Sequence, residues 1–175
     1  EFHERTGCAH RDVKPQNVCA GAGSALRGAS DCPLYLIDFG LAAPFRDDGG
    51  AHVAAVAPGA ARAAERRVHG SVKYLSVHCH RSIEAHGDAR VASRSRRCDL
   101  EAVAYVALFC ARGALPWTDL PSKRSSSPGD ARGAPDVEIH RLKALWPPRE
   151  LCADCPTLGA FLEATRALGH EDAPD

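Results

Sequence analysis

The sequence predicts a mainly α-helical domain with one short β-hairpin near its N-terminal end. Two observations predict the helices: apolar residues recur at helical spacing after Asp99, and again over 157–168. A third predicts the hairpin, because 18–20 and 34–37 are short runs of strand-forming residues on either side of a loop rich in Gly, Ala and Ser. A chain of 175 residues is long enough to bury the core of one such domain.

Composition and charge exclude several classes of protein. The 22 Lys and Arg residues balance 22 Asp and Glu residues, so a nucleic-acid partner is not expected. The longest apolar run, 102–111, is too short to cross a bilayer, and the chain does not open on a secretory signal. Eight cysteines are scattered without a disulfide framework, and Cys110 lies in the apolar run as a small hydrophobic residue. We therefore expect an intracellular protein, cytoplasmic or nuclear, with no membrane partner.

The first half of the chain is expected to be largely irregular outside the hairpin. Residues 1–9 have the pattern of a short helical end that runs into a turn. The run 34–37 is apolar throughout, which is typical of a buried strand. The stretch 38–78 has no clear periodicity, and its centre, 44–67, is rich in Ala and Arg. A loop of this length in a compact domain indicates a functional segment.

The strongest helix is predicted to begin near Asp99 and to stop at Gly113. Apolar residues stand on both of its sides, which predicts a helix that is buried all round. The loop that follows, 122–135, is rich in Ser, Gly, Pro and Arg and is expected to be flexible.

Two further helices are predicted towards the C-terminus. One covers 137–145 and ends before two consecutive prolines. The other covers 157–168, with Thr157 as its cap and Gly169 as its stop. The residues expected on its apolar face are Leu158, Phe161, Leu162 and Leu168.

Two short motifs carry the chemistry. In chain order they are His-Arg-Asp-Val-Lys-Pro-Gln-Asn (10–17) and Asp-Phe-Gly (38–40). A carboxylate such as Asp12 can orient a hydroxyl group and accept its proton, and Lys14 adds a positive charge nearby. Asn17 and Asp38 offer the oxygen ligands that Mg²⁺ prefers. Either motif alone is ordinary turn chemistry, but together, one hairpin apart, they indicate phosphoryl transfer.

These motifs resemble those of eukaryotic-type serine/threonine protein kinases. A lysine at position 14 is typical of serine/threonine kinases rather than tyrosine kinases. Further blocks are similar to the casein kinase I group: Gly-Ser-Val-Lys-Tyr-Leu-Ser-Val-His (70–78), Ser-Arg-Arg-Cys-Asp-Leu-Glu (95–101), Arg-Gly-Ala-Leu-Pro-Trp (112–117) and the tail 152–175. The group carries Asp where Cys98 stands. Vaccinia-related kinases share a similar Arg-Arg-Gly-Asp-Leu-Glu block but lack the Lys-Pro pairing, so they rank second.

The resemblance implies a protein-kinase C-terminal lobe over 1–175, with the activation segment and substrate loop at 38–78. It also implies that Asp12 is the catalytic base and that Lys14 contacts the transferred phosphoryl group. Asn17 and Asp38 would hold Mg²⁺ and, with Lys14, ATP.

The resemblance assigns supporting roles to other residues. Asp99 would hold the backbone of His10 and Arg11 by hydrogen bonds, although it could instead be a simple helix cap. Ser71 and Lys73 would lie in the substrate loop; for Ser71, an ordinary surface position is the alternative.

The sequence also departs from the kinase pattern. It opens on what looks like the end of a helix, contains no Met and has no Lys before Lys14, so the ATP-anchoring N-terminal lobe is expected to be absent. The Gly-Ala-Gly-Ser run at 21–24 follows the catalytic loop and lacks a third glycine, so it is interpreted as a hairpin loop. About ten extra residues fall near 85–94, and His78 replaces the Asn of the casein kinase I group.

Two classes of function therefore remain open. The chain is either part of an ATP-dependent kinase, inactive when isolated, or a kinase-derived pseudokinase or binding module. We expect acidic or already phosphorylated protein substrates, which a cluster of basic side chains near the substrate loop would bind. The alternative is that these side chains form an ordinary solvated basic surface. The residues of that cluster are Arg62, Arg66, Arg67 and Lys73.

A zinc site is the weakest alternative. The side chains that suggest it are His78, Cys79, His80, Cys152 and Cys155. A single Cys-x-x-C pair falls short of the four ligands at set spacing that a structural zinc site requires.

Overall fold

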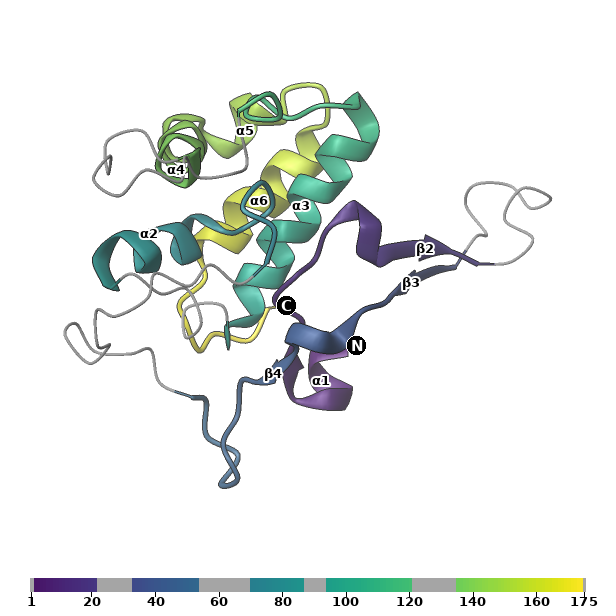
Figure 1. The fold of residues 1–175 in the computed structure, drawn as a ribbon, viewed down its shortest axis with the longest axis vertical. Helices are drawn as coiled ribbons and strands as arrows, with labels where there is room; N and C mark the ends of the chain where they lie inside the picture. The colour runs from purple at the N-terminus through teal and green to yellow at the C-terminus, as the bar shows by residue number, and fades with distance from the viewer. Residues whose placement is uncertain (1, 22–32, 54–69, 87–93, 121–134, 175) are drawn as a thin grey trace, which may run out of the picture.

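The computed structural model describes residues 2–21, 33–53, 70–86, 94–120 and 135–174. Its helices are α1 (Phe2–Thr6), α2 (Val77–His86), α3 (Arg96–Arg112), α4 (Pro135–Leu145), α5 (Pro148–Leu151) and α6 (Pro156–Ala167), with short 3-10 turns η1 (Pro15–Asn17) and η4 (Phe39–Leu41). Its strands are β1 (Cys8–Ala9), β2 (Val18–Ala20), β3 (Leu34–Leu36) and β4 (Ala43–Pro44). The predicted mainly α fold with a small amount of β-structure is confirmed (Figure 1).

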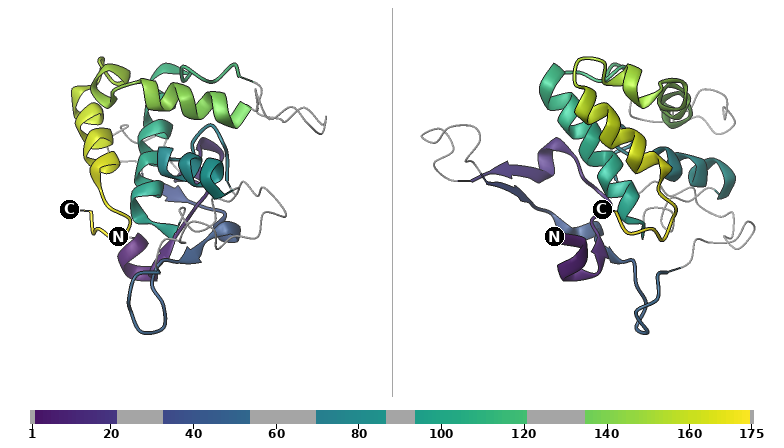
Figure 2. Two further views of the ribbon diagram at one scale, coloured as in Figure 1. Left: turned by 90° about the vertical axis from the view of Figure 1, so that its left-hand side faces the viewer. Right: turned by 180° about the vertical axis from the view of Figure 1, so that it is seen from behind.

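Helices α2 to α6 form one body, in which α3 packs along α6, α5 packs against α6, and α2 packs against α4. The two rotated views show the same grouping, with the hairpin on the other side of α3 (Figure 2). Fully buried side chains from α3, α4 and α6 meet in one cluster, which contains Tyr105, Ile139 and Leu162. Trp117 joins this cluster and meets Tyr105 edge to face, at 5.3 Å between ring centroids.

Helix α3 ends as predicted but begins earlier and is buried on one side only. Gly113 has φ +76° and donates its N–H to Phe109 O, which is a glycine stop. The helix starts at Arg96, three residues before the predicted start. Burial all round was wrong: Val103 is 43% exposed and Cys110 is exposed. These positions lie on the side of α3 away from Tyr105, where the described residues place no packing partner.

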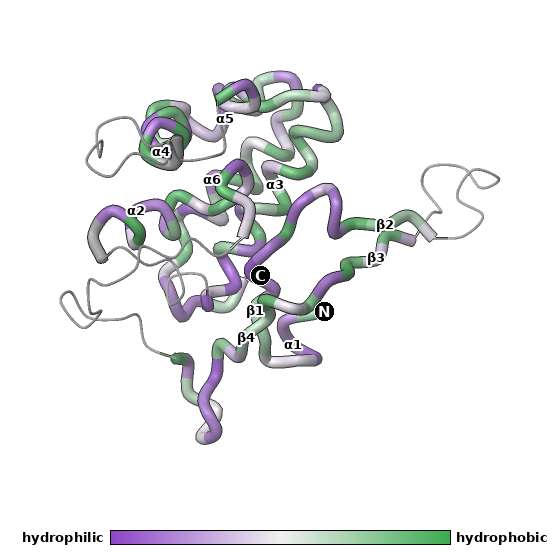
Figure 3. The backbone as a smooth tube through the Cα atoms, viewed as in Figure 1, coloured by the Kyte–Doolittle hydropathy of each residue, from purple (hydrophilic) through white to green (hydrophobic). Residues whose placement is uncertain are grey.

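The β-hairpin has the predicted strands but not the predicted burial. Val18 pairs with Leu36 and Ala20 with Leu34, in antiparallel register. The expectation of a buried strand was wrong, because Leu34 is 70% exposed. The hairpin projects away from the helices, so its hydrophobic residues lie outside the helical core (Figure 3). Two paired strands have two faces, and no described segment covers either of them.

A second pair of strands was not predicted. Cys8 pairs with Pro44 and Ala9 with Ala43, so β4 returns to the start of the chain. The predicted helical end at 1–9 is present as α1, and the turn after it uses Gly7 at φ +64°. Part of the irregular stretch 38–78 therefore has regular structure, and α2 begins inside it at Val77. The positions 54–69 at its centre lie outside the described residues.

The C-terminal helices agree with the sequence in position and differ in detail. Helix α4 contains the predicted 137–145, and the short α5 was not predicted. Helix α6 begins at Pro156, so Thr157 lies inside it and is not its cap. It ends at Ala167 with Leu168 extended, which rules out Gly169 as a glycine stop. Phe161, predicted on the apolar face, is 36% exposed.

Several predicted segments lie outside the described residues, among them the hairpin loop, most of the extra residues near 85–94 and nearly all of the 122–135 loop. Within the described part of the chain, no helix combines the length and apolar character needed to span a membrane.

Candidate active site

The loop 10–17 connects β1 to β2, and its backbone is constrained at several positions. Arg11 has φ +72°, a backbone conformation that costs a non-glycine residue about 1 kcal/mol or more. Pro15 opens the η1 turn, where its fixed φ and missing N–H are tolerated. Asn17 closes the turn, and its buried side chain points back into the loop. The loop therefore presents Asp12, Lys14 and Asn17 together.

Asp12 is the centre of the site. Its side chain is 8% exposed, and three donors surround it. Oδ2 accepts hydrogen bonds from Lys14 Nζ at 2.5 Å and from Asn17 Nδ2 at 3.3 Å. Oδ1 accepts the backbone N–H of Ser71 at 3.0 Å. These donors fix the direction of the carboxylate. One of them, the N–H of Ser71, places the 70–76 loop in contact with the predicted base.

Asn17 links Asp12 to the second motif. Its Nδ2 donates to Asp12 O at 2.9 Å, and its backbone O accepts the N–H of Ile37 at 2.9 Å. Asp38 follows Ile37 and therefore lies at the same end of the hairpin as Asn17. Asp38 has φ +63° and accepts the N–H of Gly40 at Oδ1, 3.3 Å away.

Asp99 supports the loop from α3, as the resemblance implies. Oδ2 accepts the N–H of His10 at 2.7 Å and Oδ1 accepts the N–H of Arg11 at 2.8 Å. The helix begins at Arg96, so the alternative that Asp99 is its N-cap is wrong. His3 Nε2 also lies 2.8 Å from Asp99 Oδ2, a contact that the sequence did not predict. Asp99 thus holds Arg11 in its unusual backbone conformation.

The His10 ring joins the two motifs by a second route. Its Nε2 lies 3.0 Å from Ile37 O, and its ring meets Phe39 edge to face at 5.2 Å between centroids. Arg11 Nη1 donates to Leu41 O at 3.2 Å. The predicted site residues from 10 to 38 therefore form one connected unit.

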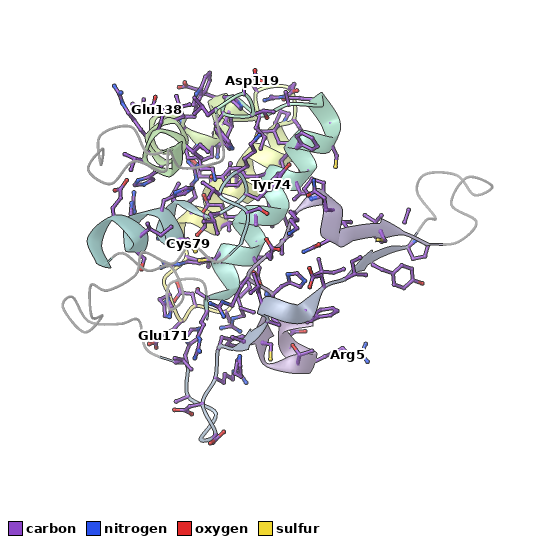
Figure 4. The ribbon with its side chains drawn as sticks, viewed as in Figure 1. Arg5, Tyr74, Cys79, Asp119, Glu138 and Glu171 are labelled. Atoms are coloured by element: carbon purple, nitrogen blue, oxygen red, sulfur yellow. The ribbon has the colours of Figure 1, made fainter. Side chains whose placement is uncertain are left out.

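The 70–76 loop approaches the catalytic loop closely at Gly70. This glycine has φ +90°, and a Cβ there would lie 2.6 Å from Arg11 O. A turn follows in which Ser71 O accepts the N–H groups of Tyr74 and Leu75. Tyr74, labelled in Figure 4, is buried beneath the loop. The structure thus places Ser71 beside Asp12, as predicted.

The Lys73 ammonium group makes a hydrogen bond to the backbone of the segment that follows α3. Its Nζ donates to Thr118 O at 2.5 Å, and Trp117 Nε1 donates to Lys73 O at 2.8 Å. Lys73 therefore ties the loop to the segment after α3. The other residues of the predicted anion cluster, Arg62, Arg66 and Arg67, lie outside the described residues.

Lys143 is a residue near the site that the sequence did not single out. It is fully buried, and its Nζ donates to Val72 O at 3.2 Å and Leu75 O at 2.6 Å. It lies over the rings of Tyr105 and Trp117. Burial lowers the pKa of Lys143 to about 7. Its spacing of four from Ile139 was the available signal, because that spacing places both on one helix face.

A buried carboxylate on α3 organises the surroundings. Glu101 Oε1 accepts hydrogen bonds from Tyr105 OH at 2.5 Å, Arg166 Nε at 3.1 Å and the N–H of Val77 at 3.2 Å. Burial, and then the Glu101 charge, raise the pKa of Tyr105 well above its ordinary value. Through Glu101, helix α3 is joined to α6 and to the first residue of α2.

The zinc alternative gains no support from the described residues. They contain no group of three or more His, Cys, Asp or Glu side chains arranged to hold a metal ion. His80, one of the suggested ligands, has its Nε2 3.3 Å from Lys143 Nζ and its ring stacked on His140.

Comparison with known proteins shows that the chain is similar to a protein kinase. No family model matches the chain. The chain is 33% identical, over 132 residues, to a probable casein kinase I homolog of Encephalitozoon cuniculi (strain GB-M1). The aligned part is 75% of this chain but 34% of the relative, so the chain spans about a third of that protein's length. This similarity supports a relationship to the protein kinases, and the mostly helical fold is compatible with the C-terminal lobe of one.

Proposed function

We propose that the chain is the large lobe of an ATP-dependent serine/threonine protein kinase, which transfers the γ-phosphoryl group of ATP to hydroxyl groups of protein substrates. The observation that supports this most strongly is the geometry of Asp12. A carboxylate that is held in one direction by Lys14, Asn17 and Ser71 is suited to orient a hydroxyl group and accept its proton.

Lys14 has two tasks in this proposal. Its ammonium group lies 2.5 Å from Asp12 Oδ2 and keeps the carboxylate in place. The same positive charge stabilises the negative charge of the phosphoryl group as it moves to the substrate oxygen. Lys14 is partly exposed, with 23% of its side chain accessible, so its ammonium group can reach a bound phosphate.

The residues at the site fit the cofactors ATP and Mg²⁺. Asn17 uses its amide nitrogen for Asp12, and among the described residues neither its amide oxygen nor Asp38 Oδ2 receives a hydrogen bond. Those two oxygens are hard ligands of the kind that Mg²⁺ prefers. Bound there, the ion would neutralise charge on the triphosphate.

The finer assignments are also proposals. The Lys-Pro pairing at 14–15 and the name of the similar protein favour the casein kinase I group over the vaccinia-related kinases. We propose acidic or already phosphorylated protein substrates and an intracellular location, cytoplasmic or nuclear. No nucleic-acid or membrane partner is proposed, since the 22 basic and 22 acidic residues balance.

The test is transfer of labelled phosphate from ATP to an acidic serine-containing peptide, measured on the longest natural polypeptide that contains these residues. Asp12→Asn should lower turnover by on the order of 100-fold or more, with an unchanged circular dichroism spectrum. Asp47→Asn, in an exposed turn, is the matched control and should keep its activity. Full activity of Asp12→Asn would disprove the role of Asp12. Nucleotide binding without any transfer by the unmutated protein would favour the pseudokinase or binding module.

A further inference from the structure

Two cysteines lie together behind the catalytic loop. Cys79 on α2 and Cys98 on α3 are 2% and 5% exposed and share a small apolar cluster with Leu75 and Ile83. Cys79, labelled in Figure 4, lies where α2 faces α3. The two thiol groups are hydrogen-bonded to each other and are not joined by a disulfide.

The thiol pair adjoins the candidate active site. A cavity of about 20 Å³ is lined by both cysteines together with Asp12, Ser76 and Asp99. A cavity of this size admits a molecule little larger than water. The pair is therefore sheltered from bulky thiols and proteins but stands beside a space that a small oxidant can enter.

We propose that Cys79 and Cys98 are a redox modification site, at which a hydroperoxide such as hydrogen peroxide converts the thiol pair to a disulfide. Cys98 stands where the casein kinase I block has Asp. A disulfide between the two side chains joins the start of α2 to the first turn of α3.

The local environment indicates which thiol reacts first. The hydrogen bond from Cys98 lowers the pKa of Cys79, whereas that same bond and burial raise the pKa of Cys98. The thiolate is the reactive form of cysteine, so Cys79 is the first nucleophile.

The reaction balances in two steps. The Cys79 thiolate attacks one peroxide oxygen, the O–O bond breaks, and sulfenic acid and one water are formed after protonation. The Cys98 sulfur then attacks the sulfenic sulfur, the S–O bond breaks, and a second water leaves as the S–S bond forms. In total, two thiols lose two electrons and two protons, and the peroxide is reduced to two molecules of water.

The disulfide would affect the candidate active site through Asp99. Cys98 precedes Asp99, whose carboxylate holds the N–H groups of His10 and Arg11. The expectation that oxidation changes the rate of phosphoryl transfer rests on the proposed function. The expectation that the disulfide forms does not. The experiment therefore measures the disulfide directly.

The experiment uses the full chain with Cys110→Ser, treated with hydrogen peroxide, unfolded in an alkylating reagent and digested with trypsin. Cleavage after Lys or Arg places Cys79 in peptide 74–81 and Cys98 in peptide 98–112. Removing Cys110 leaves one cysteine in each peptide. Cys110 lies twelve residues along α3 from Cys98, about 18 Å away, so its loss does not affect the pair.

Mass spectrometry should find the two peptides joined, two hydrogen masses lighter than their sum, and separated again by dithiothreitol. The linked peptide should be absent from the Cys79→Ala variant. In Cys98→Ala, dimedone should label Cys79, and its failure to do so would overturn the order of the steps. The proposal itself is wrong if Cys79 and Cys98 both remain alkylated while the exposed Cys19 and Cys155 are oxidised.

Discussion

The backbone N–H of Ser71 donates a 3.0 Å hydrogen bond to Oδ1 of Asp12, across 59 positions of sequence. This bond connects the loop at 70–76 to the predicted catalytic base without using a side chain of that loop. Its geometry depends on two supports: Gly70 lets the loop approach Arg11, and Asp99 holds Arg11 in place. The first two predictions test these supports separately.

Replacing Gly70 with Ala should destabilise the protein and displace the loop from Asp12. The residue has φ +90°, and the new Cβ would lie 2.6 Å from Arg11 O, which is backbone and cannot rotate away. Gly50→Ala is the control, because Gly50 has φ +82° with nothing within 4 Å of an added Cβ. Urea denaturation should show a loss of about 1–2 kcal/mol for Gly50→Ala and clearly more for Gly70→Ala. Equal losses would mean that the close contact with Arg11 has no energetic effect.

Replacing Asp99 with Ala should expose the amides of His10 and Arg11 to hydrogen exchange. Both N–H groups lose their acceptor, and His10 is fully buried, so each unpaired group costs about 1–3 kcal/mol. Asp47→Ala is a matched control: Asp47 accepts two backbone N–H groups in the same way, but in an exposed turn. Exchange measured by mass spectrometry should quicken at 10–11 in the first variant only. Unchanged protection there would show that Asp99 does not hold the loop.

The elements predicted correctly are those with local signals. The hairpin strands follow from short β-forming runs, and the end of α3 follows from Gly113. The motif residues Asp12, Asn17 and Asp38 come together because a single hairpin connects them. In each case, the physical cause lies within a few residues of the position predicted.

The features that were missed depend on distant partners. The β1–β4 pair joins residues 8–9 to 43–44, and neither strand has a pattern of its own. Burial of α3 on both sides was predicted from the apolar residues on its two sides, a pattern that cannot tell which side will have a neighbour. Lys143 and Glu101 are charged residues of types that are usually exposed, and their burial depends on hydrogen bonds with three other segments.

Breaking the buried ion pair of Arg166 should cost far more stability than breaking an exposed one. Arg166 donates to Glu101 at 3.1 Å and to Tyr105 OH at 2.8 Å, and Glu101 is fully buried. Arg166→Met removes the cation that is paired with that carboxylate, a loss of about 3–5 kcal/mol in unfolding free energy. Arg149→Met, which breaks the exposed contact with Glu163, should cost less than about 1 kcal/mol. Similar midpoints for both variants in urea would contradict the importance of the buried network.

Lys143 should make the folded state more stable as the pH rises from 7 to 9. Burial lowers its pKa from 10.5 to about 7, so in this window the unfolded chain binds more protons than the folded one. Stability therefore increases with pH, by about 2 kcal/mol between pH 7 and 9. The penalty for burying the charge is fully present below pH 7 and is relieved as the pH rises towards 10.5.

The measurement is urea denaturation at several pH values under reducing conditions, compared with the Lys143→Met variant. The variant keeps the other titratable groups near the site, namely Glu101, Cys79, Arg166, His140 and His80, so their contributions largely cancel in the comparison. His80 affects the pH dependence of stability below this window, because burial and then the Lys143 charge hold its pKa well below 6.5. The unmutated protein should gain stability relative to the variant across the window, because the variant has no Lys143 side chain to lose a proton there. If the two curves run parallel between pH 7 and 9, the Lys143 ammonium group keeps its proton through its hydrogen bonds to Val72 O and Leu75 O, and its pKa in the folded state lies above the window.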